Sequence, residues 1–114
     1  MSVRLTNRQV GDVTVIDAVG KITLGEGSSV LRDAIRDLTM ASNRKLLLNL
    51  GEVTYIDSSG IGELVAGFTS VTNLGGQFKL LNLTKRVKDL LQITKLYTVF
   101  EVHDDEANGV RSFS

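Results

Sequence analysis

The chain has 114 residues, of which 42% are hydrophobic, and its thirteen basic and thirteen acidic side chains give a formal net charge of zero. This balance points to neither a nucleic acid nor an anionic membrane as a partner. The absence of cysteine excludes disulfides and thiolate sites, the single histidine excludes a cluster of histidine ligands, and no apolar run approaches the roughly 20 residues of a membrane span.

The N-terminal segment is predicted to form a β-hairpin. Val3–Gln9 alternates loosely between apolar and polar residues, as an edge strand does. Gly11 and Asp12 then form a two-residue turn into the β-branched run Val13–Val19. The two strands are therefore expected to pair antiparallel.

A first helix is predicted after the polar, glycine-punctuated connection from Gly20 to Gly27. Ser28 or Ser29 is expected to cap it, since serine is among the preferred residues at a helix N-terminus. A period of about 3.6 residues places its apolar residues on one face. These residues are Val30, Leu31, Ala34, Ile35 and Leu38.

Leu46–Leu50 is apolar almost throughout, as expected of a central strand that is buried on both faces. A second helix is predicted from near Gly60 to the glycine stop at Leu74–Gly76. Its apolar stripe comprises Ile61, Leu64, Val65, Phe68 and Val71.

The C-terminal third is predicted to continue the alternation of strands and helices. Phe78–Leu83 reads as a strand, and Thr84 is expected to cap a short helix whose inward residues are Val87, Leu90 and Leu91. Tyr97–Val102 is predicted as the last strand, followed by a helix whose first turn carries the acids of residues 104–106.

This order predicts an α/β fold in one small domain covering residues 1–114, with a mixed sheet and about four helices. Strand–helix alternation favours right-handed crossovers and a largely parallel sheet, to which the N-terminal hairpin adds an antiparallel pair.

The segment Asp57–Gly62 lies between the buried strand and the second helix. A serine hydroxyl there faces solvent beside unpaired backbone N–H groups, which suits phosphate chemistry. Either Ser58 or Ser59 is equally suited to cap the helix while the other accepts a phosphate. A capping box is not predicted, because Gly62 stands where an acid would be needed.

With this motif in place, the chain resembles the anti-sigma factor antagonist family, the STAS domains, over nearly its whole length. Val15–Gly20 looks like the second strand of that family with its closing glycine. The segment from Leu47 through Val53 to Ile56–Gly60 looks like the family signature, and Leu74–Gly76 followed by Phe78–Leu81 matches the return from helix to strand.

The resemblance implies a protein-binding switch. In the family, the serine directly after the aspartate is phosphorylated by a partner kinase that is also the anti-sigma factor, and this position is Ser58 here. The unphosphorylated form binds the kinase and frees a bacterial sigma factor, whereas the phosphorylated form releases the kinase. A serine phosphatase is the second implied partner. No cofactor is expected in this chain, because ATP belongs to the kinase.

Partner contacts are expected around the acceptor serine, at Asp57, Ser59, Gly60, Ile61, Gly62 and Thr23. Ordinary structural roles compete with these: Asp57 suits turn chemistry, Gly60 and Gly62 suit a turn, and Ile61 suits the core. Thr23 stands where family members often carry an acid that is credited with partner recognition, so this departure puts the identity of the partner in question.

Three other interpretations remain open to a test. A two-component receiver would place its acceptor at Asp57, but the acidic cluster that holds magnesium in receivers is missing after the N-terminal strands. A dinucleotide loop at Gly60–Gly62 would need a third glycine where Val65 stands. A STAS scaffold or transporter-accessory subunit, whose serine is never phosphorylated, is the main alternative.

No enzyme, metal site, nucleic-acid partner or membrane partner is expected. No nucleophile–base pair is visible, and nothing in the sequence builds a triad around His103, which is expected in the turn before the last helix. Lys85, Arg86 and Lys88 are interpreted as a solvated helix face. The start of the chain shows no signal peptide, so the cytoplasm is the expected compartment.

Overall fold

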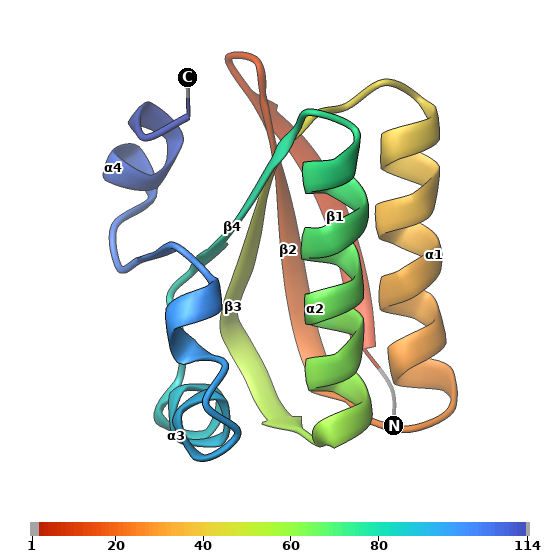
Figure 1. Ribbon diagram of the computed structural model, residues 1–114, viewed down its shortest axis with the longest axis vertical. Helices are drawn as coiled ribbons and strands as arrows, with labels where there is room; N and C mark the ends of the chain where they lie inside the picture. The colour runs from red at the N-terminus through yellow and green to blue at the C-terminus, as the bar shows by residue number, and fades with distance from the viewer. Residues whose placement is uncertain (1–2, 114) are drawn as a thin grey trace.

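The computed structural model describes residues 3–113. In chain order its elements are β1 (Val3–Val10), β2 (Val13–Ile22), α1 (Glu26–Met40), β3 (Lys45–Ile56), α2 (Ser58–Asn73), β4 (Gln77–Leu81), α3 (Lys85–Ile93), a 3₁₀ turn (Tyr97–Val99), β5 (Val102–His103) and α4 (Glu106–Arg111). The strands form one sheet in the order β1-β2-β3-β4-β5, with β1 antiparallel to β2 and all other pairs parallel. The predicted fold class is confirmed (Figure 1).

The helices cover the sheet unequally. Residues of α1, α2 and α3 pack with one face of the sheet in the main core, whereas a small second cluster lies on the other face and is covered by Val110 of α4 and by Phe113. Strand β3 supplies both, since Leu46, Leu48 and Leu50 lie in the main core and Leu47 in the second cluster. The expectation of a strand buried on both faces is thus confirmed.

Two predicted turns form as expected. Gly11, with φ +64°, closes the β1–β2 hairpin, in which Val10 pairs with Val13. Helix α2 ends at Asn73 with Leu74 at its C-cap; Gly75 follows with φ +80°, and the Gly76 N–H donates to the Val71 carbonyl at 2.9 Å. A left-handed glycine with this backbone bond is a common helix stop.

The start of α1 differs from the prediction. The helix begins at Glu26 with Gly25 at its N-cap, so neither Ser28 nor Ser29 caps it. Gly25 has φ +98°, a conformation that favours glycine, and its carbonyl accepts the N–H of Ser29 at 3.1 Å. The Ser28 side chain is buried, and its hydroxyl donates to the Gly25 carbonyl at 3.3 Å. Strand β2 also runs on to Ile22, so the connection is shorter than predicted.

The predicted last strand, Tyr97–Val102, is wrong. Its first three residues form a 3₁₀ turn, and β5 holds only Val102 and His103, which places His103 in a strand and not in the following turn. Tyr97, Phe100 and Val102 pack instead onto the main core, where the Phe100 and Phe68 rings meet edge to face with centroids 5.6 Å apart. The acids that follow do open α4, whose N-cap Asp105 accepts the N–H of Asn108.

Candidate functional site

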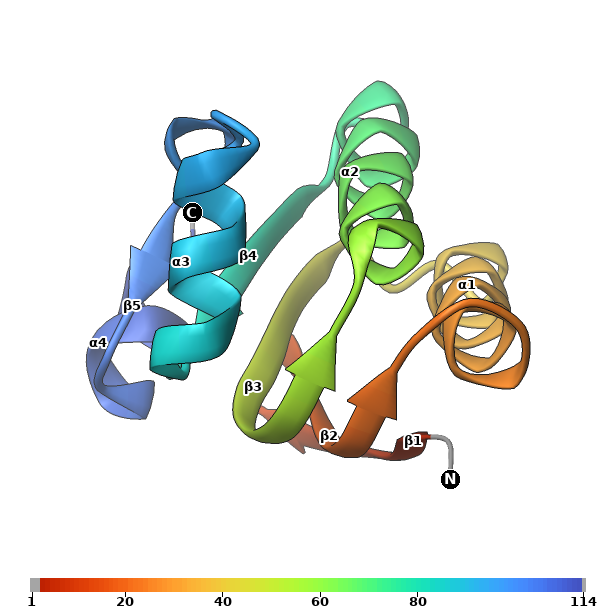
Figure 2. The same cartoon turned by 90° about the horizontal axis from the view of Figure 1, so that it is seen from below.

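The predicted site lies where the carboxyl ends of β2 and β3 lead into α1 and α2, as Figure 2 shows. Ligands of α/β sheets commonly bind at this edge. The two strands are adjacent and end in register, since Ile22 pairs with Ile56. The residues that follow them, Thr23 and Asp57, are therefore brought to the same end of the molecule although they lie far apart in sequence.

Asp57 caps α2, and neither serine does. Its extended backbone precedes the helix, and its Oδ1 accepts the N–H of Gly60 at 3.0 Å. Its Oδ2 accepts the N–H of Leu24, in the loop after β2, at 2.9 Å. Partial burial opposes ionisation of this carboxyl, but the surrounding backbone N–H donors outweigh it and hold the pKa of Asp57 below its ordinary value. Asp57 is thus a charged clamp between the helix and the loop.

Ser58 is the first residue of α2 and its side chain is exposed. Among residues 3–113, no group hydrogen-bonds its hydroxyl. Ser59 is half-buried, and its backbone N–H faces the Asp57 carboxylate. The sequence allowed either serine to cap α2, but Asp57 caps it instead. The hydroxyl of Ser58 therefore has no role in capping the helix.

The two glycines of the motif have different environments. Gly60 is buried, and a Cβ placed there would lie 2.3 Å from the Ile22 carbonyl oxygen and 2.6 Å from Cγ1 of Ile56. The backbone that approaches Gly60 is therefore that of β2 in the same chain. Gly62 is exposed, and a Cβ there would meet nothing within 4 Å.

Ile61 is only 3% exposed and belongs to the main core. This burial favours the core role that the sequence offered as the alternative to a partner contact for the Ile61 side chain. Helical geometry explains it, because Ile61 continues the apolar stripe of Leu64 and Val71 that packs on the sheet.

The loop from Thr23 to Gly25 borders the motif. Thr23 is half-buried, and its carbonyl accepts the N–H of Ser28 at 2.9 Å. Leu24, which no sequence motif singled out, has a side chain that is 78% exposed. A leucine directly before a glycine in an otherwise polar loop was the available signal.

The basic residues of α3 have local partners. Lys85 pairs with Asp89 at 2.7 Å, one helical turn further on, and the Arg86 guanidinium carbon lies 4.2 Å from the centroid of the Tyr55 ring. The Nζ of Lys88 lies 5.7 Å from the Tyr97 ring. These contacts agree with a solvated face.

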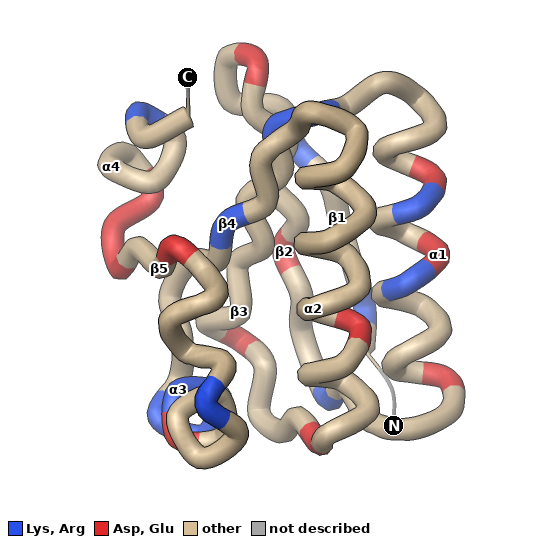
Figure 3. Tube along the Cα trace, viewed as in Figure 1, with Lys and Arg blue, Asp and Glu red and all other residues tan. Residues whose placement is uncertain are grey.

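Helix α2 carries almost no charge. Glu63 is its one ionisable residue, and Figure 3 shows the rest of the helix in tan. A phosphate on Ser58 would add about −1.5 to −2 charges to a helix that otherwise carries only the charge of Glu63.

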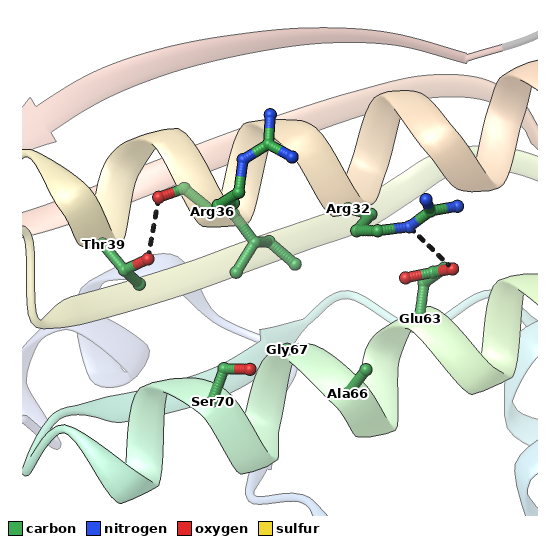
Figure 4. A pocket seen from close by; sticks show the side chains of 8 residues that line it. Arg32, Arg36, Thr39, Glu63, Ala66, Gly67 and Ser70 are labelled. Carbon is green, nitrogen blue, oxygen red and sulfur yellow. Dashed lines mark hydrogen bonds and ion pairs between the residues drawn. The ribbon is translucent and has the colours of Figure 1, made fainter.

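A shallow groove of about 320 Å³ runs between α1 and α2 (Figure 4). Gly67 forms part of its floor because a Cβ there would lie 2.8 Å from Cδ1 of Ile35. Arg32 and Glu63 face each other across it, with Nε and Oε2 3.3 Å apart. Arg36, the other charged residue of the groove, pairs with Asp33 at 3.2 Å and with Asp37 at 3.6 Å.

The part of the chain from Val3 to Phe113 contains no cluster of three or more His, Asp or Glu side chains that could hold a metal ion. No helix in that part is both long enough and apolar enough to cross a bilayer.

Comparisons with known proteins place these observations in context. A family model described as STAS domain matches residues 4–109. The anti-sigma-B factor antagonist of Bacillus subtilis (strain 168) is 29% identical over 111 residues, covering 97% of this chain and 100% of that protein. Among solved structures, an anti-sigma factor antagonist from Mycobacterium paratuberculosis has a TM-score of 0.85 at 17% identity, covering 98% of this chain and 94% of its own. The Bacillus cell fate determinant SpoIIAA in its phosphorylated form has a TM-score of 0.75 at 17% identity, covering 96% of this chain and 98% of its own.

Proposed function

The chain belongs to the STAS domain family, and on this premise we propose that it is an anti-sigma factor antagonist controlled by phosphorylation of Ser58. The observation that carries the proposal is the exposed hydroxyl at the start of α2, left without a hydrogen bond in the described residues because Asp57 caps the helix. The names of its relatives support the role, and one structural neighbour was solved in a phosphorylated form.

The proposed partner is an anti-sigma factor with serine kinase activity. The kinase binds the face around Ser58 while the hydroxyl is unphosphorylated, and it thereby releases its sigma factor. The γ-phosphoryl group of ATP then passes to Oγ of Ser58, the hydroxyl loses its proton, and ADP leaves. A serine phosphatase hydrolyses the phosphate ester and restores the binding form. The chain itself acts as a binding module, in the cytoplasm, and not as an enzyme.

The switch depends on where the added charge is tolerated. At the N-terminus of α2, the helix dipole stabilises an anion such as a phosphoserine by about 0.3–1 kcal/mol. An apposed partner that fits a neutral hydroxyl must bury a dianion, which costs several kcal/mol when the charge is unpaired. Because about 1.4 kcal/mol corresponds to a tenfold change in affinity, one phosphate is sufficient to end binding without a change of fold.

Phosphosite mapping tests this proposal. The purified protein is incubated with host lysate and ATP, and trypsin then releases residues 46–79 as one peptide because no lysine or arginine lies between its ends. Tandem mass spectrometry should place the phosphate on Ser58, and Ser58→Ala should remove it. Ser70→Ala is the matched control, since Ser70 is an exposed serine of the same helix and the same peptide.

An unmodified peptide, in lysate whose kinases are shown to be active, would contradict the proposal. That result would favour the alternative of a scaffold or transporter-accessory STAS subunit.

A further inference from the structure

Leu24 is the most exposed of the large apolar side chains in the described residues, at 78%. It stands in the loop between β2 and α1, next to the clamp formed by Asp57. Single exposed leucines are common on protein surfaces, so exposure alone does not mark a site. Leu24 differs from such residues because its backbone is hydrogen-bonded to the residue directly before Ser58.

The backbone of the loop is fixed on both sides of Leu24. The Leu24 N–H donates to Oδ2 of Asp57 at 2.9 Å, and the Thr23 carbonyl accepts the N–H of Ser28 at 2.9 Å. Gly25 follows with φ +98°, and its carbonyl accepts a further N–H of α1. These bonds hold the Leu24 backbone in place while its side chain remains in solvent.

The space beneath the loop is already filled. Both helix starts press on the end of β2: a Cβ on Gly27 would lie 2.7 Å from the Lys21 carbonyl oxygen, and one on Gly60 would lie 2.3 Å from that of Ile22. The two helices are this close only because glycines face the strand. The leucine side chain takes no part in this packing and projects from the surface.

We propose that Leu24 is a specificity-determining contact for the anti-sigma kinase and that this kinase presents an apolar recess beside the site that receives Ser58. The inference rests on the proposed function. The same carboxylate that bonds the Leu24 N–H belongs to the residue directly before Ser58, so a kinase that reaches the Ser58 hydroxyl also lies over Leu24. None of the loop residues 23–25 carries a charged side chain, so Leu24 is the residue of this loop that can bury the most apolar area on binding. A leucine with a fixed backbone loses little freedom on binding.

The test compares the affinity of Leu24→Ala with that of wild type for the kinase that phosphorylates Ser58, by isothermal titration calorimetry without ATP. Removing most of a leucine side chain that becomes buried on binding is expected to weaken affinity by about 10–100-fold. Met40→Ala is the matched control, because Met40 is 77% exposed but ends α1 at the opposite end of the molecule (Figure 1). It should bind like wild type, and neither substitution should lower the melting temperature.

Leu24→Met is a second variant that keeps an apolar side chain of similar volume, and it should retain most of the affinity. Wild-type affinity of Leu24→Ala would overturn the inference and leave the proposed function standing. If wild type bound no such kinase and Ser58 stayed unmodified, the proposed function would fall and the inference with it.

Discussion

Replacing Gly60 and Gly62 separately with alanine should have opposite effects on stability. Both glycines lie in the first turns of α2, two residues apart, but only Gly60 faces the sheet. The same chemical change at the two positions therefore probes the packing of α2 on the sheet at Gly60 and the exposed surface of the helix at Gly62.

The expected magnitudes follow from the space around each Cα. At Gly60 an added Cβ would lie 2.3 Å from the Ile22 carbonyl oxygen and 2.6 and 2.9 Å from side-chain carbons of Ile56 and Ile22. The oxygen is backbone and cannot rotate away, so β2 and α2 must separate, and we expect a loss of about 2–4 kcal/mol. At Gly62 the Cβ meets nothing within 4 Å, and the gain in helix propensity is about 0.5–1 kcal/mol.

Thermal and urea unfolding followed by circular dichroism measure both effects. One kcal/mol corresponds to a shift in melting temperature of about 3–6 °C for a chain of this size, so Gly60→Ala should melt about 6–24 °C lower and Gly62→Ala a few degrees higher. Equal melting temperatures for Gly60→Ala and wild type would refute the close approach of α2 to β2. A destabilised Gly62→Ala would refute the open surface described at that position.

Three further results are expected. Asp57→Ala should lower the free energy of unfolding by about 0.5–2 kcal/mol through loss of the cap, as measured by urea unfolding, whereas Asp57→Asn keeps most of the cap. The fold lowers the pKa of Asp57 below its ordinary value of 3.8, so the charged carboxylate stabilises the fold above pH 3.8 and stops doing so as the pH falls through the lowered pKa. The difference in free energy of unfolding between wild type and Asp57→Asn should therefore vanish in acid. Arg8→Met should lower the free energy of unfolding by about 1 kcal/mol at pH 7, since Arg8 binds Asp17 and Glu106 on a largely exposed surface and lowers the pKa of both. Thermal unfolding in acid should show no such loss, and a loss that persisted there would exclude the ion pairs as its cause. Ser58→Asp should leave the circular dichroism spectrum unchanged and weaken kinase binding, and an affinity equal to that of wild type would contradict the switch.

The sequence predicted the order of elements where hydrophobic patterns were long. The apolar run at Leu46–Leu50 and the apolar stripe of α2 are both buried in the folded chain, so the secondary structure predicted from their patterns agrees with their tertiary packing. The prediction failed at Tyr97–Val102, because a short β-branched and aromatic run suits a strand as well as a 3₁₀ turn packed on the core.

Within the site, the position of Ser58 at the start of a helix could be predicted, but which residue caps that helix could not. Serine and aspartate both cap helices, and only the geometry shows that Asp57 caps α2 and also holds the backbone of Leu24. That bond joins residues 33 positions apart, so no local pattern reveals it. The burial of Ile61 likewise depends on which face of α2 meets the sheet.

The affinity of the anti-sigma kinase for the unphosphorylated and the Ser58-phosphorylated protein tests the central claim most directly. Both forms are prepared from one batch, separated by ion exchange and titrated into the kinase by calorimetry without ATP. The account predicts that the phosphorylated form binds at least about 100-fold more weakly, because a partly buried dianion costs several kcal/mol. Equal affinities of the two forms would contradict it.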